Sequence, residues 1–396
     1  MRRVRLGVVA NEFFALGVGR MGGFGWAARA VAQIFEDRAL GVDVLFLTGE
    51  LRASRGAVTT TLHGRTVTLR SSSPVRTIRH VRAADPDVLL LIDYRPNYRA
   101  VCWALPRTPM IAWMRDPRPP EDVATVDALR IPGEDDIQPK GTFQPDCRSL
   151  GTLYRIGRWM GRPVLVAPTC DSIGAKTIRM LGTTVPLSPA LPNPVTPLPV
   201  QPGPKDGRLV VAVLGRLDPY KRPWLGLELA RLLPEVEFWF LGKAFHAGRG
   251  AWEPKDVPSN ARFLGHVDGR DKYERLGAAS VLLNTSAHEG LAVSFLEALA
   301  CETPIVATVD PDRLVTRFGR FAGRFPGAGV EGLPALERSV RDLLENEEQR
   351  RRLGVEGRQF VEATHSRERF LEEFRALAAR VGVPLPALPV DNVDAA

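Results

Sequence analysis

Two glutamates eight positions apart, Glu289 and Glu297, are the residues of this sequence best placed for chemistry. Around them the sequence predicts an apolar strand at 281–283, a turn, a short helix and a second apolar strand at 305–308. A carboxylate on the loop after a strand faces the crevice in which open α/β sheets bind ligands. The first amides of a helix attract anions. Two acids beside such a helix end suit a ligand with both hydroxyl and phosphate groups, such as a sugar nucleotide.

A simpler interpretation of both acids stays open at this stage. Ser294 and Glu297 match a capping box, in which the glutamate only satisfies amides of its own helix. Glu289 would then be one more solvated surface acid. On this stretch alone, the functional and the purely structural interpretations carry equal weight.

A second stretch places positive charge at a strand end. The apolar run 209–214 ends at Gly215, and Arg216 and Lys221 follow in the loop before a helix that starts near Pro223. Arginine offers a planar fork and lysine a compact charge, and both suit phosphate oxygens. The glycine lets a ligand approach the backbone closely. Taken alone, this stretch is also explained by a charged loop in solvent.

Together, and in this order, the two stretches resemble the C-terminal domain of retaining GT-B glycosyltransferases of glycosyltransferase family 4. The resemblance rests on Gly-Arg-Leu at 215–217 with Lys221, and on Glu289 followed by Glu-Ala-Leu-Ala-Cys at 297–301. It is strong over 210–309 and weaker before that. It implies an α/β protein of the GT-B fold, with two Rossmann-like, doubly wound parallel-sheet domains facing an interdomain cleft.

The resemblance also implies roles for individual residues. Arg216 and Lys221 would bind the pyrophosphate and offset the charge that grows on it as the glycosidic bond breaks. Glu297 would accept hydrogen bonds from the ribose and Glu289 from the donor sugar, so Arg216, Lys221 and Glu289 are the candidate catalytic residues. Further donor contacts are expected from Gly215, from the amides of Gly290, Leu291, Ala292 and Val293, and from His266 and Val267 near the base. Because fixed cations and a helix dipole would replace a metal ion, we expect no metal and no cofactor, with the nucleotide sugar as substrate.

The N-terminal half follows the family pattern less closely. Gly22 and Gly23 lie before a helical pattern, where the family has a Gly-Gly loop that faces the donor phosphates; a flexible turn is the alternative. After the apolar run 110–114, many family members carry a His-Asp pair, whereas this sequence has Arg115 and Asp116. An arginine stays protonated and cannot act as a base, but it can bind a phosphate or an acceptor carboxylate. We therefore place Arg115 and Asp116 on the acceptor side.

The length and the patterning predict two domains. A chain of 396 residues exceeds what one core supports, and a proline-dense stretch at 186–204 divides it. Strands alternate with helices on both sides of that stretch, which predicts two parallel sheets. The expected division is an N-terminal acceptor-binding domain (1–190), a C-terminal nucleotide-sugar-binding domain (191–365), a last helix (366–381) that in resembling enzymes crosses back to the N-terminal domain, and a loose tail (382–396).

Charge is distributed unevenly between the halves. Residues 1–195 hold 26 Lys and Arg against 17 Asp and Glu, a surplus of nine positive charges, whereas 196–396 hold 27 against 28. A basic surface attracts anionic partners, including acidic lipid head groups and glycans. A general preference for arginine codons explains the surplus equally well. No nucleic-acid-binding motif accompanies the charge, so we expect no nucleic acid partner.

Location is predicted from what the sequence lacks. No run of about 18 apolar residues is present to span a membrane, and the N-terminus leads into a strand with no sign of a signal peptide. We expect a cytoplasmic protein, with peripheral association at the inner face of the membrane left open. The four cysteines have spacings that fit neither a disulfide framework nor a zinc site.

The expected activity is retaining transfer of a sugar from a nucleotide sugar to a glycan, lipid or small-molecule acceptor. Two alternatives remain: an epimerase or phosphorylase of the same fold, and a non-catalytic relative that binds sugar nucleotides. Arg115, in the place of the usual histidine, supports the non-catalytic alternative. The base, the sugar, the acceptor and the oligomeric state cannot be deduced from the sequence.

Overall fold

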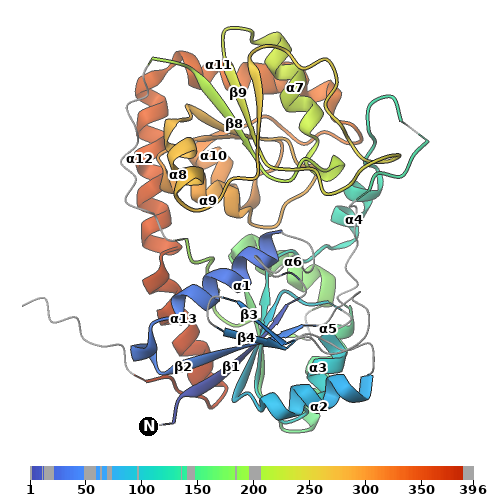
Figure 1. Ribbon diagram of the computed structural model, residues 1–396, viewed down its shortest axis with the longest axis vertical. Coiled ribbons are helices and arrows are strands. Elements are labelled where there is room, and N and C mark those ends of the chain that lie inside the picture. The colour runs from blue at the N-terminus through green and yellow to red at the C-terminus, as the bar shows by residue number, and fades with distance from the viewer. Residues whose placement is uncertain are drawn as a thin grey trace, which may run out of the picture. The chain divides into compact units, whose positions relative to one another are not determined.

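The chain folds into two compact units, each built on one sheet (Figure 1). Unit 1 comprises residues 1–117, 145–194 and 367–396, and unit 2 comprises residues 118–144 and 195–366. The structure, a computed structural model, describes residues 2–10, 12, 22–48, 59–62, 65–68, 74–95, 98–134, 136–140, 148–182, 185–195 and 207–386.

The sheet of unit 1 has seven strands in the order β3-β4-β2-β1-β5-β6-β7. Neighbouring strands run parallel, except for the antiparallel pair β3–β4. The apolar runs that form β5 and β6 are buried along their whole length, as expected for strands covered on both faces. The strands are β1 (Val4–Ala10), β2 (Val42–Thr48), β3 (Thr59–Leu62), β4 (Arg65–Thr68), β5 (Val88–Ile92), β6 (Met110–Met114) and β7 (Val164–Pro168).

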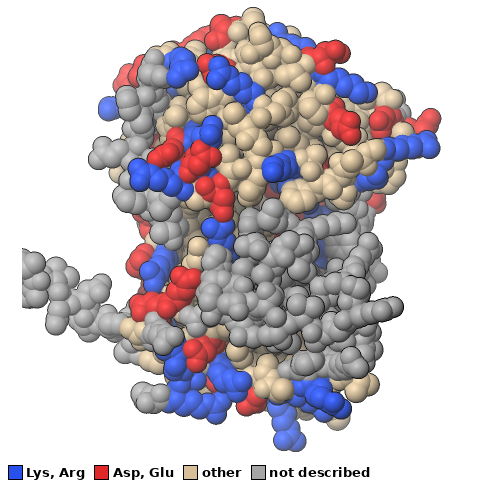
Figure 2. Space-filling model, viewed as in Figure 1, with Lys and Arg blue, Asp and Glu red and all other residues tan. Residues whose placement is uncertain are grey.

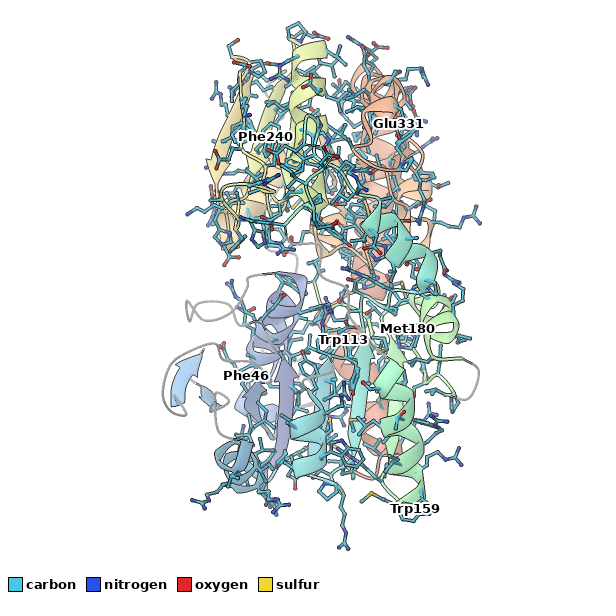
Figure 3. The ribbon with its side chains drawn as sticks, turned by 90° about the vertical axis from the view of Figure 1, so that its right-hand side faces the viewer. Phe46, Trp113, Trp159, Met180, Phe240 and Glu331 are labelled. Atoms are coloured by element: carbon cyan, nitrogen blue, oxygen red, sulfur yellow. The ribbon has the colours of Figure 1, made fainter. Side chains whose placement is uncertain are left out.

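The core of unit 1 joins segments from both ends of the chain. Phe35, which follows α1, meets Phe374 of α13 with ring centroids 5.7 Å apart, and Trp113 of β6 meets Phe370 of α13 at 5.5 Å. Figure 3 shows Phe46 and Trp113 within this unit. The helices are α1 (Gly23–Ile34), α2 (Pro74–Ala84), α3 (Arg99–Ala104), α5 (Arg148–Trp159), α6 (Asp171–Leu181) and α13 (Arg367–Arg380), with a 3₁₀ turn η1 (Arg38–Leu40).

The sheet of unit 2 has six parallel strands in the order β10-β9-β8-β11-β12-β13. Helices join the consecutive strands of this sheet except β9 and β10, whose connection at 242–260 contains no helix. Parallel strands connected through helices are the pattern of doubly wound folds. The strands are β8 (Val210–Leu214), β9 (Glu237–Leu241), β10 (Ala261–Gly265), β11 (Val281–Asn284), β12 (Ile305–Ala307) and β13 (Gly319–Phe321).

The core of unit 2 packs α7 and α11 on one face of this sheet, around the buried ring of Phe240. Leu129 and Ile131 join the same core from the segment 118–144, although that segment follows directly on unit 1 in the sequence. The helices are α4 (Pro120–Asp127), α7 (Pro223–Leu232), α8 (Gly269–Ala278), α9 (Val293–Ala300), α10 (Leu314–Phe318), α11 (Leu333–Glu345) and α12 (Glu347–Thr364), with 3₁₀ turns η3 (Pro219–Lys221), η4 (Pro311–Arg313) and η5 (Val330–Gly332).

The predicted fold class, two α/β units with parallel sheets, is confirmed. Three strands are not predicted from the sequence: β3, β4 and β13. Their sequences are short and carry no apolar run, since β3 reads Thr-Thr-Thr-Leu and β13 reads Gly-Arg-Phe. Such short strands, at a sheet edge or next to it, are held by pairing with their neighbours, which periodicity does not reveal. Among the described helices, none is long and apolar enough to cross a bilayer.

Candidate functional site

Two loops at the carboxyl edge of the unit 2 sheet bring the two charged motifs together. The first loop leaves β8 and contains η3, and the second leaves β11 and leads into α9. Backbone contacts tie the loops to each other, because Ala287 N donates to Tyr220 O at 3.1 Å and Thr285 Oγ1 donates to Lys221 O at 2.8 Å. Residues far apart in the sequence are thus held at the edge where open α/β sheets bind ligands.

Lys221 and Glu289 form the centre of this arrangement. The ammonium group of Lys221 donates to Glu289 Oε1, which also accepts from Ser286 Oγ at 2.6 Å and from Asn284 Nδ2 at 3.2 Å. Burial raises the pKa of Glu289, but the charge of Lys221 and the three hydrogen bonds more than offset this, and the pKa lies below its ordinary value. Glu289 is therefore an ionised acceptor at neutral pH, not a surface acid in bulk solvent.

Arg222, the neighbour of Lys221, fixes both loops from inside the unit. It is 1 % exposed and adopts left-handed backbone angles (φ 47°) directly before Pro223. Its guanidinium donates to four oxygens, which are Thr285 O at 2.8 Å, Ser286 O at 3.1 Å, Thr308 Oγ1 at 3.2 Å and Phe325 O at 2.7 Å. Burial lowers the pKa of Arg222 to about 10, so the side chain stays charged at neutral pH. The sequence analysis does not assign it a role, although it stands between Lys221 and the predicted helix start.

Glu297 does not form a capping box, so that interpretation is wrong. The helix α9 begins at Val293 with Ala292 as its N-cap, which places Ser294 inside the helix, where it cannot cap. Glu297 instead accepts a hydrogen bond at 2.6 Å from Lys272 Nζ of α8, and both side chains are buried. Lys272 is absent from the sequence-based site, because a single lysine in a helix gives no signal of its partner.

Residues of the segment 118–144 contact both loops. Asp122 of α4 lies with one carboxylate oxygen 3.4 Å from His288 Nδ1, and both residues are buried. The ring of His288 meets Tyr220 edge to face at 6.4 Å, and Arg118 lies over Tyr220 at 5.2 Å. Tyr220 and His288, the neighbours of Lys221 and Glu289 in the sequence, are thus packed against the segment 118–144.

The other predicted donor-binding residues surround this centre. Gly215, Arg216 and Lys221 line a pocket together with Asn284 and Ser286. Arg216 lies 3.4 Å from the buried carboxylate of Asp218, and a quarter of the Arg216 side chain is exposed. The amide-bearing residues Gly290, Leu291, Ala292 and Val293 form the turn into α9, Val267 is buried and His266 is exposed after β10.

The predicted acceptor-side residues meet in unit 1. Arg115 follows β6, is 5 % exposed, donates to Asn193 Oδ1 and reaches the carbonyl of Gly23 at 3.4 Å. Its guanidinium also lies 4.5 Å from the ring of Trp113. Burial lowers the pKa of Arg115 to about 10, so the charge remains at neutral pH. The amides of Arg115 and Asp116 both donate to the buried carboxylate of Asp93, at 3.1 and 3.3 Å.

The carboxylate of Glu12 lies at the N-terminus of α1, beside the predicted glycines. Its carboxylate accepts from Gly25 N at 3.2 Å, and a Cβ added to Gly22 would lie 2.7 Å from Glu12 Oε2. A side chain at Gly22 would therefore displace the flexible end of Glu12, whereas a Cβ at Gly23 would meet no atom within 4 Å. The expected contact of both glycines with donor phosphates stays a prediction. Within the described ranges, no three His, Cys, Asp or Glu side chains are grouped to hold a metal ion.

Comparisons with known proteins bear on the fold and on the C-terminal part of the chain. Residues 196–360 match the family model of glycosyl transferases group 1. The fold is similar to sucrose-phosphate synthase from Thermosynechococcus elongatus, with a TM-score of 0.69 and 16% identity over 96% of this chain and 99% of that one. Over residues 196–360 the sequence is thus similar to group 1 glycosyl transferases, and the chain has the GT-B fold.

Two further GT-B structures cover nearly the whole chain. Anabaena HepE, determined in complex with UDP and glucose, has a TM-score of 0.66 and 14% identity over 95% of this chain and all of that one. The pneumococcal O-GlcNAc transferase GtfA, in complex with UDP and GlcNAc, has a TM-score of 0.64 and 9% identity over 96% of this chain and 99% of that one. Among proteins of curated function, none matches this sequence.

Proposed function

We propose that this GT-B protein is a retaining glycosyltransferase that uses a nucleotide-sugar donor bound by unit 2. The observation that carries the proposal is the meeting of Lys221 and Glu289, which lie 68 positions apart and come from the two motifs of the group 1 domain. An ammonium group has three donors, so Lys221 can bind a phosphate oxygen while it holds Glu289. Arg216 supplies a second cation at the same pocket.

In this mechanism, cations act where charge develops. As the glycosidic bond breaks, negative charge grows on the leaving diphosphate, and Lys221, Arg216 and the amides of Gly290 to Val293 are placed to stabilise it. Ionised Glu289 accepts hydrogen bonds from the donor sugar, and Glu297 accepts them from the ribose. Retention then follows from attack on the face that the leaving phosphate occupies, and the groups named here act without a metal ion.

The donor that we propose carries UDP, because HepE and GtfA both hold UDP in their structures. We further propose an anionic acceptor, a glycan or a lipid, because residues 1–195 carry nine surplus positive charges. Arg115, which keeps its charge, would bind an acidic group of that acceptor or a donor phosphate. The protein would act in the cytoplasm.

The first test is turnover. The full chain is incubated with a panel of UDP-sugars without an acceptor, and UDP release is compared with that of Lys221→Ala. Slow hydrolysis by the wild type alone supports the enzyme, whereas binding of a UDP-sugar without any release supports a non-catalytic relative. With an acceptor in hand, NMR of the product anomer tests retention, since an inverted product would contradict the mechanism.

A further inference from the structure

An exposed tryptophan marks the edge of unit 1 where β5, β6 and β7 begin, opposite the edge that carries Arg115. Trp159 ends α5 with 86% of its surface exposed, next to Met160 at 40%. Trp103 of α3 is 43% exposed. Figure 3 shows Trp159 at the lower end of the unit, far from Trp113 in the core. Monomeric proteins rarely leave large apolar side chains in solvent in a group, and such a group marks an interaction surface.

Hydrogen bonds between helix ends bring these side chains to one edge. The chain after α5 is joined to the end of α3, because Arg162 donates to Thr108 O at 2.6 Å and to Cys102 O at 3.1 Å. The end of α2 is joined to α3 in the same way, since Arg82 Nε donates to Ala104 O at 3.2 Å. The ends of α2, α3 and α5 are therefore neighbours. We call the exposed residues on them the tryptophan edge: Arg82, Trp103, Arg107, Arg155, Arg158, Trp159 and Met160.

The charge of the tryptophan edge has one sign. The sequence contains no Asp or Glu in 51–84, 94–115 or 147–170, the three stretches from which the edge is built. The nearest acids along the sheet, Asp85 and Asp87, already pair with Arg5 and Arg2 at 3.5 and 2.9 Å. Figure 2 shows Lys and Arg side chains projecting from the lower end of this unit.

We propose that the tryptophan edge docks unit 1 on a membrane surface that contains anionic lipids. Tryptophan is favoured at the level of lipid head groups, where its ring is apolar and its N–H is hydrated, and exposed arginines attract anionic head groups. A second copy of this chain is a poor occupant, because a two-fold contact would set the same arginines against each other. The proposal goes beyond sugar transfer and does not depend on it.

The experiment uses the full chain and two vesicle types, phosphatidylcholine alone and phosphatidylcholine mixed with phosphatidylglycerol. Co-sedimentation across a salt series gives the partition, and tryptophan emission reports burial of the ring. We expect binding to the anionic vesicles with a blue shift, and a steep loss as salt rises, since exposed charges are screened over about 10 Å at 0.1 M. The same protein should leave neutral vesicles largely unbound.

Variants distinguish binding through the tryptophan edge from non-specific attraction by the basic charge of the whole protein. Trp159→Ser with Met160→Ser should lower partition by roughly tenfold, because membrane affinity scales with the buried apolar area, and Arg155→Ser with Arg158→Ser should remove most of the salt dependence. The matched control is Arg351→Ser with Arg352→Ser, an equal charge change on exposed positions of α12. Folding of each variant is checked by circular dichroism and by its thermal unfolding midpoint, neither of which requires a ligand.

Three outcomes would overturn the proposal. One is equal partition of the tryptophan variant and the wild type, and another is an equal loss in the α12 control. The third is binding of a single-stranded oligonucleotide or an acidic protein at this edge, lost in the same variants, without binding to anionic vesicles.

Discussion

Lys221 donates to Glu289 in the free protein, and its ammonium group has further donors for a diphosphate. Lys221→Ala should therefore weaken binding of UDP by about 1.5–3 kcal/mol, the range for a charge-assisted hydrogen bond. Calorimetry with UDP measures this. Lys255→Ala, at an exposed position of the same unit, is the control and should leave affinity unchanged. Full affinity in a folded Lys221→Ala protein would remove Lys221 from the site.

The ion pair of Glu297 with Lys272 allows the proposed role of Glu297 in ribose binding to be separated from its contribution to stability. Glu297→Gln removes the nearest counter-charge of the buried Lys272 and leaves only the carboxylate of Asp268, 3.9 Å away. Breaking a buried pair costs up to about 3–5 kcal/mol of stability. If Glu297 also accepts from the ribose, affinity for UDP should fall while affinity for pyrophosphate persists.

A double variant isolates the binding effect. Glu297→Gln with Lys272→Met removes both charges, so stability should return towards the wild type while UDP affinity stays low. Chemical denaturation and calorimetry on both variants give the two quantities. Recovery of UDP affinity together with stability would assign Glu297 to structure alone.

Among the elements, α4 supports the loop of Glu289 through Asp122 and His288. Asp122→Asn keeps the shape but removes the charge, so the loop should loosen and affinity for a UDP-sugar should fall by about tenfold. Affinity for UDP alone should change less, because the two cations proposed to bind the diphosphate, Lys221 and Arg216, come from the other loop.

Glu121→Gln, one residue earlier and exposed, is the matched control for Asp122→Asn. The ratio of UDP-sugar to UDP affinity is the decisive measurement, since general destabilisation would lower both. An unchanged ratio in Asp122→Asn would mean that α4 does not position Glu289.

The elements also explain what the sequence predicts well. The runs 210–214 and 281–283 are apolar along their whole length and are followed by charged loops, so both strands and their loops follow from local pattern. The choice of Lys221 and Glu289 as site residues rests in addition on the resemblance to the glycosyltransferase family, since each stretch alone is also explained by a charged loop in solvent. Lys272, Asp122 and Arg222 do not, because each acts on a partner that only tertiary packing brings near.

At the scale of the molecule, each unit is completed by a segment from elsewhere in the chain. The segment 118–144 adds Leu129 and Ile131 to the core of unit 2, and α13 adds Phe370 and Phe374 to the core of unit 1. The sequence analysis anticipates a last helix but assigns 118–144 to the first domain. The sequence of 118–144 does not indicate which core its few apolar residues join, because only the folded structure brings them to unit 2.

Because α13 packs in the core of unit 1, we expect a substitution in this helix to destabilise unit 1 alone. Phe374 is fully buried and meets both Phe35 and Phe370, so Phe374→Ala should cost about 3–5 kcal/mol. Hydrogen exchange should then speed up for the amides of β5 and β6, while those of β8 and β11 stay protected. UDP affinity should persist, because the donor loops belong to unit 2. Glu368→Ala, exposed on the same helix, should change neither quantity. Equal loss of protection in both sheets would mean that the two units unfold as one, and that α13 stabilises the whole chain rather than unit 1 alone.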